Sequence, residues 1–242
     1  MKKILLGMFL LLSVFTFSKV SAKKLQKKNN KQEDVELVFI LDRSGSMGGL
    51  ESDTIGGYNS MLSKQKNQKK GKVYVTTVLF DDEYELLHNQ VSIEEMKPIT
   101  EKEYYVRGST ALLDAIGKTI MQVKANQDKK ENKDKVLFVI ITDGLENASK
   151  EYRKDLIKKM IEERKEKDEW EFLFLGANID AIDAAGELGI ESSRAVRYKS
   201  DKKGTAKNYD VLNKAVEEIR AGNGIKDSWK EEIEKDVKNR GN

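Results

Sequence analysis

Apolar runs of strand length alternate with segments of helical periodicity along most of this chain, and this alternation constrains the fold more than any other feature. The strand candidates richest in apolar residues are 35–41 and 136–141. Strands linked through helices of ten or more residues pair in parallel, and near-continuous apolar strands lie at the centre of a sheet covered on both faces. We therefore predict the α/β class: a doubly wound, Rossmann-like, mostly parallel central sheet with helices on both faces and one short antiparallel edge strand.

The remaining elements follow from the same patterns. Further strands are expected at 72–80, 84–88, 170–175 and 195–198, with 84–88 forming a hairpin with the strand before it. Helices are expected at 50–66, 110–124, 150–166, 180–188 and 205–221, and a last one at 227–238. The apolar side of the charged helix 150–166 is predicted to include Tyr152, Leu156, Ile157, Met160 and Ile161.

Residues 1–22 have the pattern of an export signal. Lys2 and Lys3 precede an apolar run at 4–17, and Val20-Ser21-Ala22 offers the small residues that a signal peptidase accepts. The apolar run is shorter than the roughly 20 residues that a membrane span needs. We expect cleavage after Ala22 and a secreted, extracellular or cell-surface protein, with an uncleaved anchor as the alternative.

The positive net charge of the chain comes from this signal. The formal net charge is +3, but the signal holds three of the 44 basic residues and no acid, which leaves 41 basic against 41 acidic residues. A neutral chain without a recognisable nucleic-acid motif argues against binding to DNA or RNA. The absence of cysteine excludes disulfides. Residues 23–33 are expected to be a flexible linker, or else a basic patch for anionic envelope polymers, 34–222 a single domain and 223–242 a charged tail.

Short oxygen-bearing side chains follow the two most apolar strands. The loop after 35–41 carries Asp42, Ser44 and Ser46, and the loop after 136–141 carries Asp143. Thr110 opens the helix that lies between them in the sequence. Sites in doubly wound sheets lie beyond the carboxyl ends of the strands, where the winding direction reverses, so these loops are expected to form the site. The alternative is that Ser44 and Ser46 cap the helix 50–66 and Asp143 fills a turn.

Asp-x-Ser-x-Ser after one apolar strand, a distant threonine, and Thr-Asp-Gly after a second apolar strand resemble a von Willebrand factor type A (vWA) domain over about residues 34–222. The resemblance implies a metal-ion-dependent adhesion site (MIDAS). By this similarity Ser44, Ser46 and Thr110 supply hydroxyl oxygens to the ion, and Asp42 and Asp143 bind it or hold its waters. The closest likeness is to small bacterial proteins that carry little beyond this domain.

This donor set fits the chemistry of a hard dication. Carboxylates and hydroxyls suit Mg²⁺ or Mn²⁺, and Ca²⁺ is a further option. Three of the five donors are neutral, so the ion keeps much of its charge and attracts an acidic side chain from a partner. We therefore expect a secreted protein-binding module rather than an enzyme. The expected partner of this module is an extracellular or cell-envelope protein that offers a carboxylate.

Other polar residues have weaker claims to a role. Arg43 and Met47 could face a partner, and Asp114 could stand beside the ion or be an exposed helix acid. Glu146, with its neighbour Asn147, could rim the site or cap the next helix. The segment 81–83 could bind a second cation, although a hairpin turn is favoured.

Two other functions compete with adhesion. The first is a Mg²⁺-dependent hydrolase of phosphate or ester substrates, with Asp42 as nucleophile and Asp143 as metal ligand. Against it, Ser44 occupies the place of the second aspartate of haloacid-dehalogenase-type phosphatases, and no phosphate-cradling glycine loop is present. The second is an envelope protein whose ion only stabilises the fold. A zinc site is not expected, because His88 is the single histidine and cysteine is absent.

Overall fold

A six-stranded sheet forms the centre of the computed structural model, which describes residues 33–68, 71–177 and 179–241. The sheet order is β3-β2-β1-β4-β5-β6, and all neighbours pair in parallel except β2 and β3. The predicted fold class is confirmed. The predicted signal, and all of the predicted linker except Glu33, lie outside the described residues. The strands are β1 Val35–Asp42, β2 Val73–Phe80, β3 Tyr84–Ser92, β4 Lys135–Thr142, β5 Glu171–Ala177 and β6 Ala195–Tyr198.

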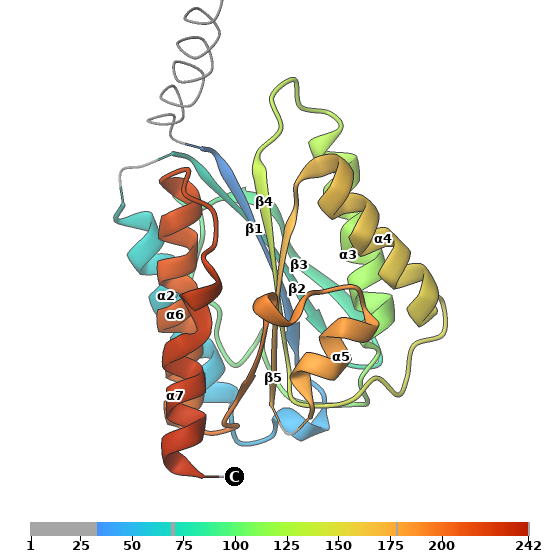
Figure 1. Cartoon of the computed structure of the whole chain (residues 1–242), viewed down its shortest axis with the longest axis vertical. Helices are drawn as coiled ribbons and strands as arrows, with labels where there is room; N and C mark the ends of the chain where they lie inside the picture. Colours follow the sequence, from blue (N-terminus) through green and yellow to red (C-terminus); the bar gives the residue numbers. More distant parts are fainter. Residues whose placement is uncertain (1–32, 69–70, 178, 242) are drawn as a thin grey trace, which may run out of the picture. The chain divides into compact units, whose positions relative to one another are not determined.

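Helices cover both faces of the sheet, with α2, α6 and α7 on one side and α3, α4 and α5 on the other (Figure 1). Alternate residues of β1 enter the two cores, Leu37 and Phe39 on the α2/α6 side and Val38 and Ile40 on the α3/α4 side. Because successive side chains point to opposite faces and both faces are covered, every residue of β1 is buried, which explains its nearly unbroken apolar sequence. The helices are α2 Glu51–Lys66, α3 Leu112–Gln127, α4 Lys154–Asp168, α5 Ala181–Glu187, α6 Lys202–Arg220 and α7 Glu231–Arg240, with short 3₁₀ turns η1 Gly45–Met47, η2 Ser192–Arg194 and η3 Asp227–Lys230.

The edge strand β3 extends to Ser92, four residues beyond its predicted end. Its register against β2 is irregular, and Gln90 has a φ of 53° while its N–H donates to Thr76 Oγ1. A bulge of this kind breaks the alternation from which a strand is recognised in sequence. His88 therefore lies within the strand rather than at its end.

Helix α4 begins at Lys154 rather than at residue 150. The N–H groups of Lys150, Glu151 and Tyr152 donate to the carboxylate of Asp114 and so belong to a loop. The prediction that Leu156 points inward is wrong, because 44% of its surface is exposed while Ile157 and Ile161 are buried.

The charged segment after Asn223 is part of the fold rather than a tail. The last helix expected at 227–238 is present as η3 followed by α7, and Ile225 and Ile233 are buried in the α2/α6-side core. The indole N–H of Trp229 also donates to the carbonyl of Ser193 at 2.8 Å. The high charge of this segment concealed its narrow apolar stripe. Within the described part of the chain, no helix combines the length and the apolar character needed to cross a bilayer.

Candidate metal centre

The loops after β1 and β4 meet at the carboxyl edge of the sheet. These strands are parallel neighbours, with Leu41 beside Ile141, and the chain continues from β1 to β2 on one side and returns to β4 on the other. The reversal of winding therefore falls between them, as the sequence predicted. In Figure 1 this edge lies at the lower end of the sheet.

Asp42 closes β1 and is fully buried. Its Oδ1 accepts from the backbone N–H of Ser44 at 2.7 Å, and its Oδ2 accepts from Thr142 Oγ1 at 2.6 Å. Burial raises the pKa of Asp42, while these hydrogen bonds oppose the rise and the nearby Asp143 adds to it. Asp42 thus fixes the β1 loop and ties it to the end of β4.

Three hydroxyl groups converge beside it. Ser44 Oγ lies 3.1 Å from Ser46 Oγ, and Thr110 Oγ1 donates to Ser44 Oγ at 3.1 Å. Thr110 lies in the loop two residues before α3, whereas the sequence placed it at the start of the helix. Ser44 and Thr110 are buried, but Ser46 is exposed, so the cluster opens to solvent.

Gly144 brings the β4 loop against these hydroxyls. A Cβ at this position would lie 3.1 Å from Ser46 Oγ and 3.1 Å from Thr110 Oγ1. A side chain there would crowd both hydroxyls, which would have to shift by a few tenths of an ångström, so glycine favours the close approach of the two loops. The β4 loop, which carries Asp143, is thereby held next to the hydroxyls of Ser46 and Thr110.

The carboxylate of Asp143 is buried without a hydrogen-bond partner among the described residues. The residue is 3% exposed, and neither carboxylate oxygen forms a hydrogen bond with any residue that the structure describes. Burial raises the pKa of Asp143, and the nearby Ser46 hydroxyl opposes the rise. Buried carboxylates in proteins are normally paired, so two unpaired oxygens beside three hydroxyls are what a cation would satisfy.

The residues present therefore fit Mg²⁺ or Mn²⁺. The set offers carboxylate and hydroxyl oxygens, which suit a small hard cation that keeps some of its waters. Among residues 33–68, 71–177 and 179–241, no three His, Cys, Asp or Glu side chains group in a way that could hold a metal. The arrangement thus differs from an all-carboxylate or histidine-based metal centre.

Arg43 and Met47 do not face outward, so the prediction that they could contact a partner is wrong. Both side chains are buried. Arg43 Nε donates to Asp81 Oδ2 at 2.9 Å, and its Nη1 donates to Glu85 Oε2 at 2.6 Å. The burial of Arg43 could not be predicted from its neighbours in sequence, because the two acids that pair with it lie about 40 residues away.

Asp114 and Glu146 are anchors of the loop that follows Asp143. Asp114 accepts the three backbone bonds of residues 150–152 described above, so it is not an exposed helix acid. Glu146 Oε2 accepts from the N–H of Leu113 at 2.9 Å, at the start of α3, and its Oε1 accepts from the N–H of Ser149 at 2.7 Å. It therefore caps the helix that Thr110 precedes, rather than the next one. A carboxylate there also interacts favourably with the helix dipole.

Two further residues support the site, of which Tyr104 was missed in the sequence. Tyr104 Oη donates to the carbonyl of Asp42 at 2.6 Å, and Asn147 Oδ1 accepts from the N–H of Thr110 at 2.9 Å. Asn147 was noted only as a rim or cap residue. Burial raises the pKa of Tyr104, so it remains a hydrogen-bond donor at neutral pH. Tyr104 is 62 residues from its acceptor, and sequence spacing cannot reveal such a pair.

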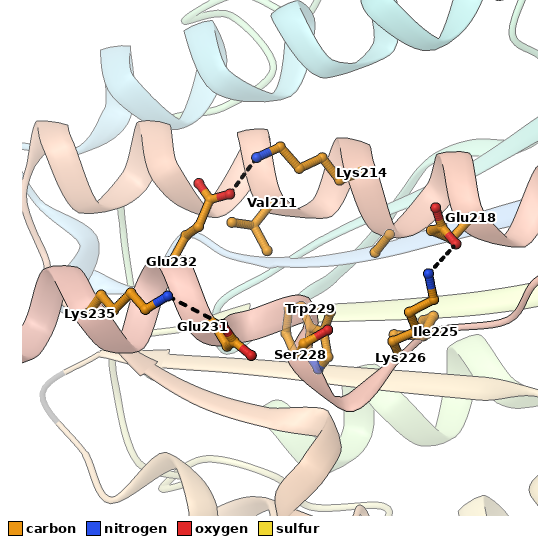
Figure 2. Close-up of a pocket in the computed structure, with 11 residues that line it drawn as sticks. Val211, Lys214, Glu218, Ile225, Lys226, Ser228, Trp229, Glu231, Glu232 and Lys235 are labelled. Atoms are coloured by element: carbon orange, nitrogen blue, oxygen red, sulfur yellow. Dashed lines mark hydrogen bonds and ion pairs between the residues drawn. The ribbon is translucent and has the colours of Figure 1, made fainter.

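A shallow groove of about 350 Å³ lies elsewhere, between α6, η3 and α7 (Figure 2). Its apolar floor includes Val211, Ile225 and Trp229. Its charged rim is paired internally, in the ion pairs Lys214–Glu232, Lys226–Glu218 and Lys235–Glu231. The groove shares no lining residue with the oxygen cluster and does not compete with it as a candidate site.

No protein-family model and no curated protein matches the chain. Solved structures do match. Proximal thread matrix protein 1 from the mussel byssus is 14% identical, with a TM-score of 0.55 over 76% of this chain and 46% of that one. A von Willebrand factor type A structure from Catenulispora acidiphila is 13% identical, with a TM-score of 0.52 over 76% of this chain and 42% of that one.

The PilB minor pilin from Streptococcus sanguinis is 12% identical, with a TM-score of 0.55 over 80% of this chain and 63% of that one. The mussel protein has also been solved with zinc in its MIDAS motif. This chain spans less than two thirds of the length of each of these structures. The strand order, the single antiparallel edge strand and these matches together show that the chain has the vWA fold.

Proposed function

We propose that this protein is a metal-ion-dependent binding module that holds Mg²⁺ or Mn²⁺ through Asp42, Ser44, Ser46, Thr110 and Asp143. The observation that carries the proposal is the buried, unpaired carboxylate of Asp143 beside three converging hydroxyls. Asp42 would act through its bonded oxygens, by holding the loop or the waters of the ion. These donors would leave part of the ion's octahedral shell open to water or to a further ligand.

The surroundings of the cluster favour a protein partner. The exposed Ser46 makes the centre reachable from solvent. Leu145, directly after Gly144, is 64% exposed. A partner that offers a carboxylate to the ion and a small apolar surface to Leu145 would use both features, since apolar contacts commonly surround the polar anchor of an interface.

The structural neighbours support adhesion as the kind of function. One is a thread matrix protein solved with zinc in its MIDAS motif, and another is a minor pilin. The export signal expected at 1–22 would place this chain outside the cytoplasm, where such partners are met. An extracellular or cell-envelope protein is therefore the partner class we propose.

Binding is supported over hydrolysis by the surroundings of Asp42. A nucleophilic carboxylate needs an oxygen open to substrate, but both oxygens of Asp42 accept hydrogen bonds inside the protein and the side chain is fully buried. A hydrolase would have to break these bonds before each attack. The geometry is that of a positioning carboxylate.

The test measures metal and partner binding on the same proteins. Isothermal titration with Mn²⁺ is expected to give one site per chain, which Asp143→Ala and Asp42→Ala abolish. Asp134→Asn is the matched control, because Asp134 is also a buried aspartate but pairs with Lys130 and precedes β4, at the opposite end of that strand. Capture from envelope extracts should require Mg²⁺ and disappear in EDTA. Capture that persists in EDTA and in Asp143→Ala would refute the proposal, and metal stabilisation without any capture would favour a purely structural ion.

A further inference from the structure

Asp81 lies directly after β2, is fully buried, and accepts hydrogen bonds from two arginines. Its Oδ2 accepts from Arg43 Nε at 2.9 Å and from Arg107 Nε at 2.7 Å. Its Oδ1 accepts from the N–H of Glu83 at 2.7 Å, which closes the β2–β3 turn. The sequence suggested only a turn, or a second cation site, for this segment.

The two arginines belong to the two loops that carry four of the five candidate ligands. Arg43 sits between Asp42 and Ser44, and Arg107 lies three residues before Thr110. The backbone of the same loops is joined as well, because the N–H of Arg107 donates to the carbonyl of Arg43 at 2.9 Å. One carboxylate is thus the common acceptor for both sides of the hydroxyl cluster.

Further backbone contacts hold the Thr110 loop against the Asp81 turn. The N–H of Ala111 donates to the carbonyl of Asp81 at 2.8 Å, and the N–H of Gly45 donates to the carbonyl of Gly108 at 3.1 Å. Gly108 has a φ of 67°, and a Cβ there would lie 1.9 Å from Asp82 Oδ1. The loop therefore fits closely on the turn, in a backbone conformation that favours glycine.

Charge gives Asp81 a second effect on the same centre. Arg43, the residue after Asp42, carries a buried positive charge. Without a compensating acid, this charge would repel a dication bound nearby. Asp81, together with Glu85, pairs with Arg43. Losing the Asp81 carboxylate would leave the Arg43 charge compensated by the half-exposed Glu85 alone.

We propose that Asp81 is a positioning residue for the metal centre, which holds the Ser44/Ser46 loop and the Thr110 loop together through Arg43 and Arg107 and offsets the charge of Arg43. The inference rests on the proposed function, since it presumes that these loops bind a metal. Residues that orient metal ligands from outside typically change metal affinity by about 10- to 100-fold when replaced.

The experiment titrates the full-length protein and its variants with Mn²⁺ by calorimetry, and records the electron paramagnetic resonance spectrum of the bound ion. Asp81→Asn is expected to weaken Mn²⁺ binding about 10- to 100-fold and to broaden the spectrum through a less uniform ligand geometry. Arg107→Met should weaken binding less, and it is expected to fold because the Arg107 side chain is 38% exposed. Asp134→Asn also removes a buried carboxylate from an ion pair, with the partly exposed Lys130, and should leave both readouts unchanged.

The outcomes separate this inference from the proposed function. If the unmodified protein does not bind Mn²⁺, the metal centre and the role of Asp81 both fail. If it binds Mn²⁺ and both Asp81→Asn and Arg107→Met bind with unchanged affinity and spectrum, the role of Asp81 is overturned while the metal centre stands. An equal loss of affinity in Asp134→Asn would also overturn it, because the effect would then come from general destabilisation.

Discussion

Replacing Asp143 by asparagine is expected to reverse the order of stability between the variant and the unmodified protein when metal is added. The Asp143 carboxylate is buried without a hydrogen bond, and the amide keeps its shape while removing its charge. A buried group left without partners costs about 1–3 kcal/mol, and more when it is charged. In EDTA, Asp143→Asn should therefore be the more stable protein, because its amide avoids the additional cost of burying a charge, and each kcal/mol of difference corresponds to roughly 2–4 °C of melting temperature in a chain of this size.

Metal acts in the opposite direction. An ion that binds only the folded state at 100 times its Kd stabilises that state by about 2.7 kcal/mol. The unmodified protein should gain this increment from Mg²⁺, whereas Asp143→Asn should gain little because it has lost a charged ligand. The two melting curves, followed by circular dichroism in EDTA and in excess Mg²⁺, should thus exchange their order.

Two results would refute this reasoning. If Asp143→Asn melts below the unmodified protein in EDTA, the carboxylate has a stabilising partner in the folded state. If the variant gains as much from Mg²⁺ as the unmodified protein, Asp143 is not a ligand. Asp134→Asn serves as control, since it breaks the pair with Lys130 and should be destabilised equally in both conditions while keeping the full metal increment.

Four further predictions concern the rest of the molecule. Gly57→Ala should lower stability by about 1–3 kcal/mol in urea unfolding, because the added Cβ would lie 2.2 Å from the Tyr209 ring where α2 and α6 pack together; an unchanged midpoint would contradict this packing. Deleting 223–242 should lower the melting temperature sharply, because it uncovers buried core residues; a true tail could be removed without effect. Leu145→Ala should leave stability and Mn²⁺ affinity unchanged and weaken partner capture, since the side chain is exposed beside the cluster. Burial lowers the pKa of His88, so the folded state resists protonation of this residue. The stability contributed by neutral His88 should therefore be lost as pH falls below about 6.5. His88→Gln should flatten the dependence of melting temperature on pH between 7 and 5, and an unchanged slope would exclude this effect.

The order of strands and helices could be predicted because each buried strand carries its own apolar signal. The strands β1 and β4 are buried on both faces, so their sequences are almost continuously apolar and their central place follows. The errors fall where burial is partial or one-sided. The edge strand β3 is half-buried and bulged. The last helix was predicted, but its packing on the core was not, because α7 buries only Ile233 and Asp236 among ten mostly charged residues.

The candidate ligands could be located for a related reason. Once parallel pairing places the ends of β1 and β4 side by side, Asp42, Ser44, Ser46 and Asp143 must lie near one another, and the structure brings the hydroxyls of Ser44 and Ser46 to within hydrogen-bond distance. Their role as metal ligands stays a prediction. The geometry adds that Asp42 is hydrogen-bonded while Asp143 is not, a difference that two aspartates after two apolar strands do not reveal in sequence.

The residues that hold these ligands in place could not be predicted, because their partners are distant in the chain. Arg43 meets Asp81 across 38 residues, and Asp114 meets the 150–152 loop across 36 to 38. Each pair forms only because the fold brings segments that are distant in the chain to the same end of the sheet. A metal centre in which three of the five donors are neutral hydroxyls binds its ion weakly unless the loops are already in place, so its affinity should depend on these distant pairs as well as on the ligands themselves. Comparing Asp81→Asn with Asp143→Asn in one Mn²⁺ titration would therefore measure how much of the binding free energy comes from holding the loops and how much from direct coordination.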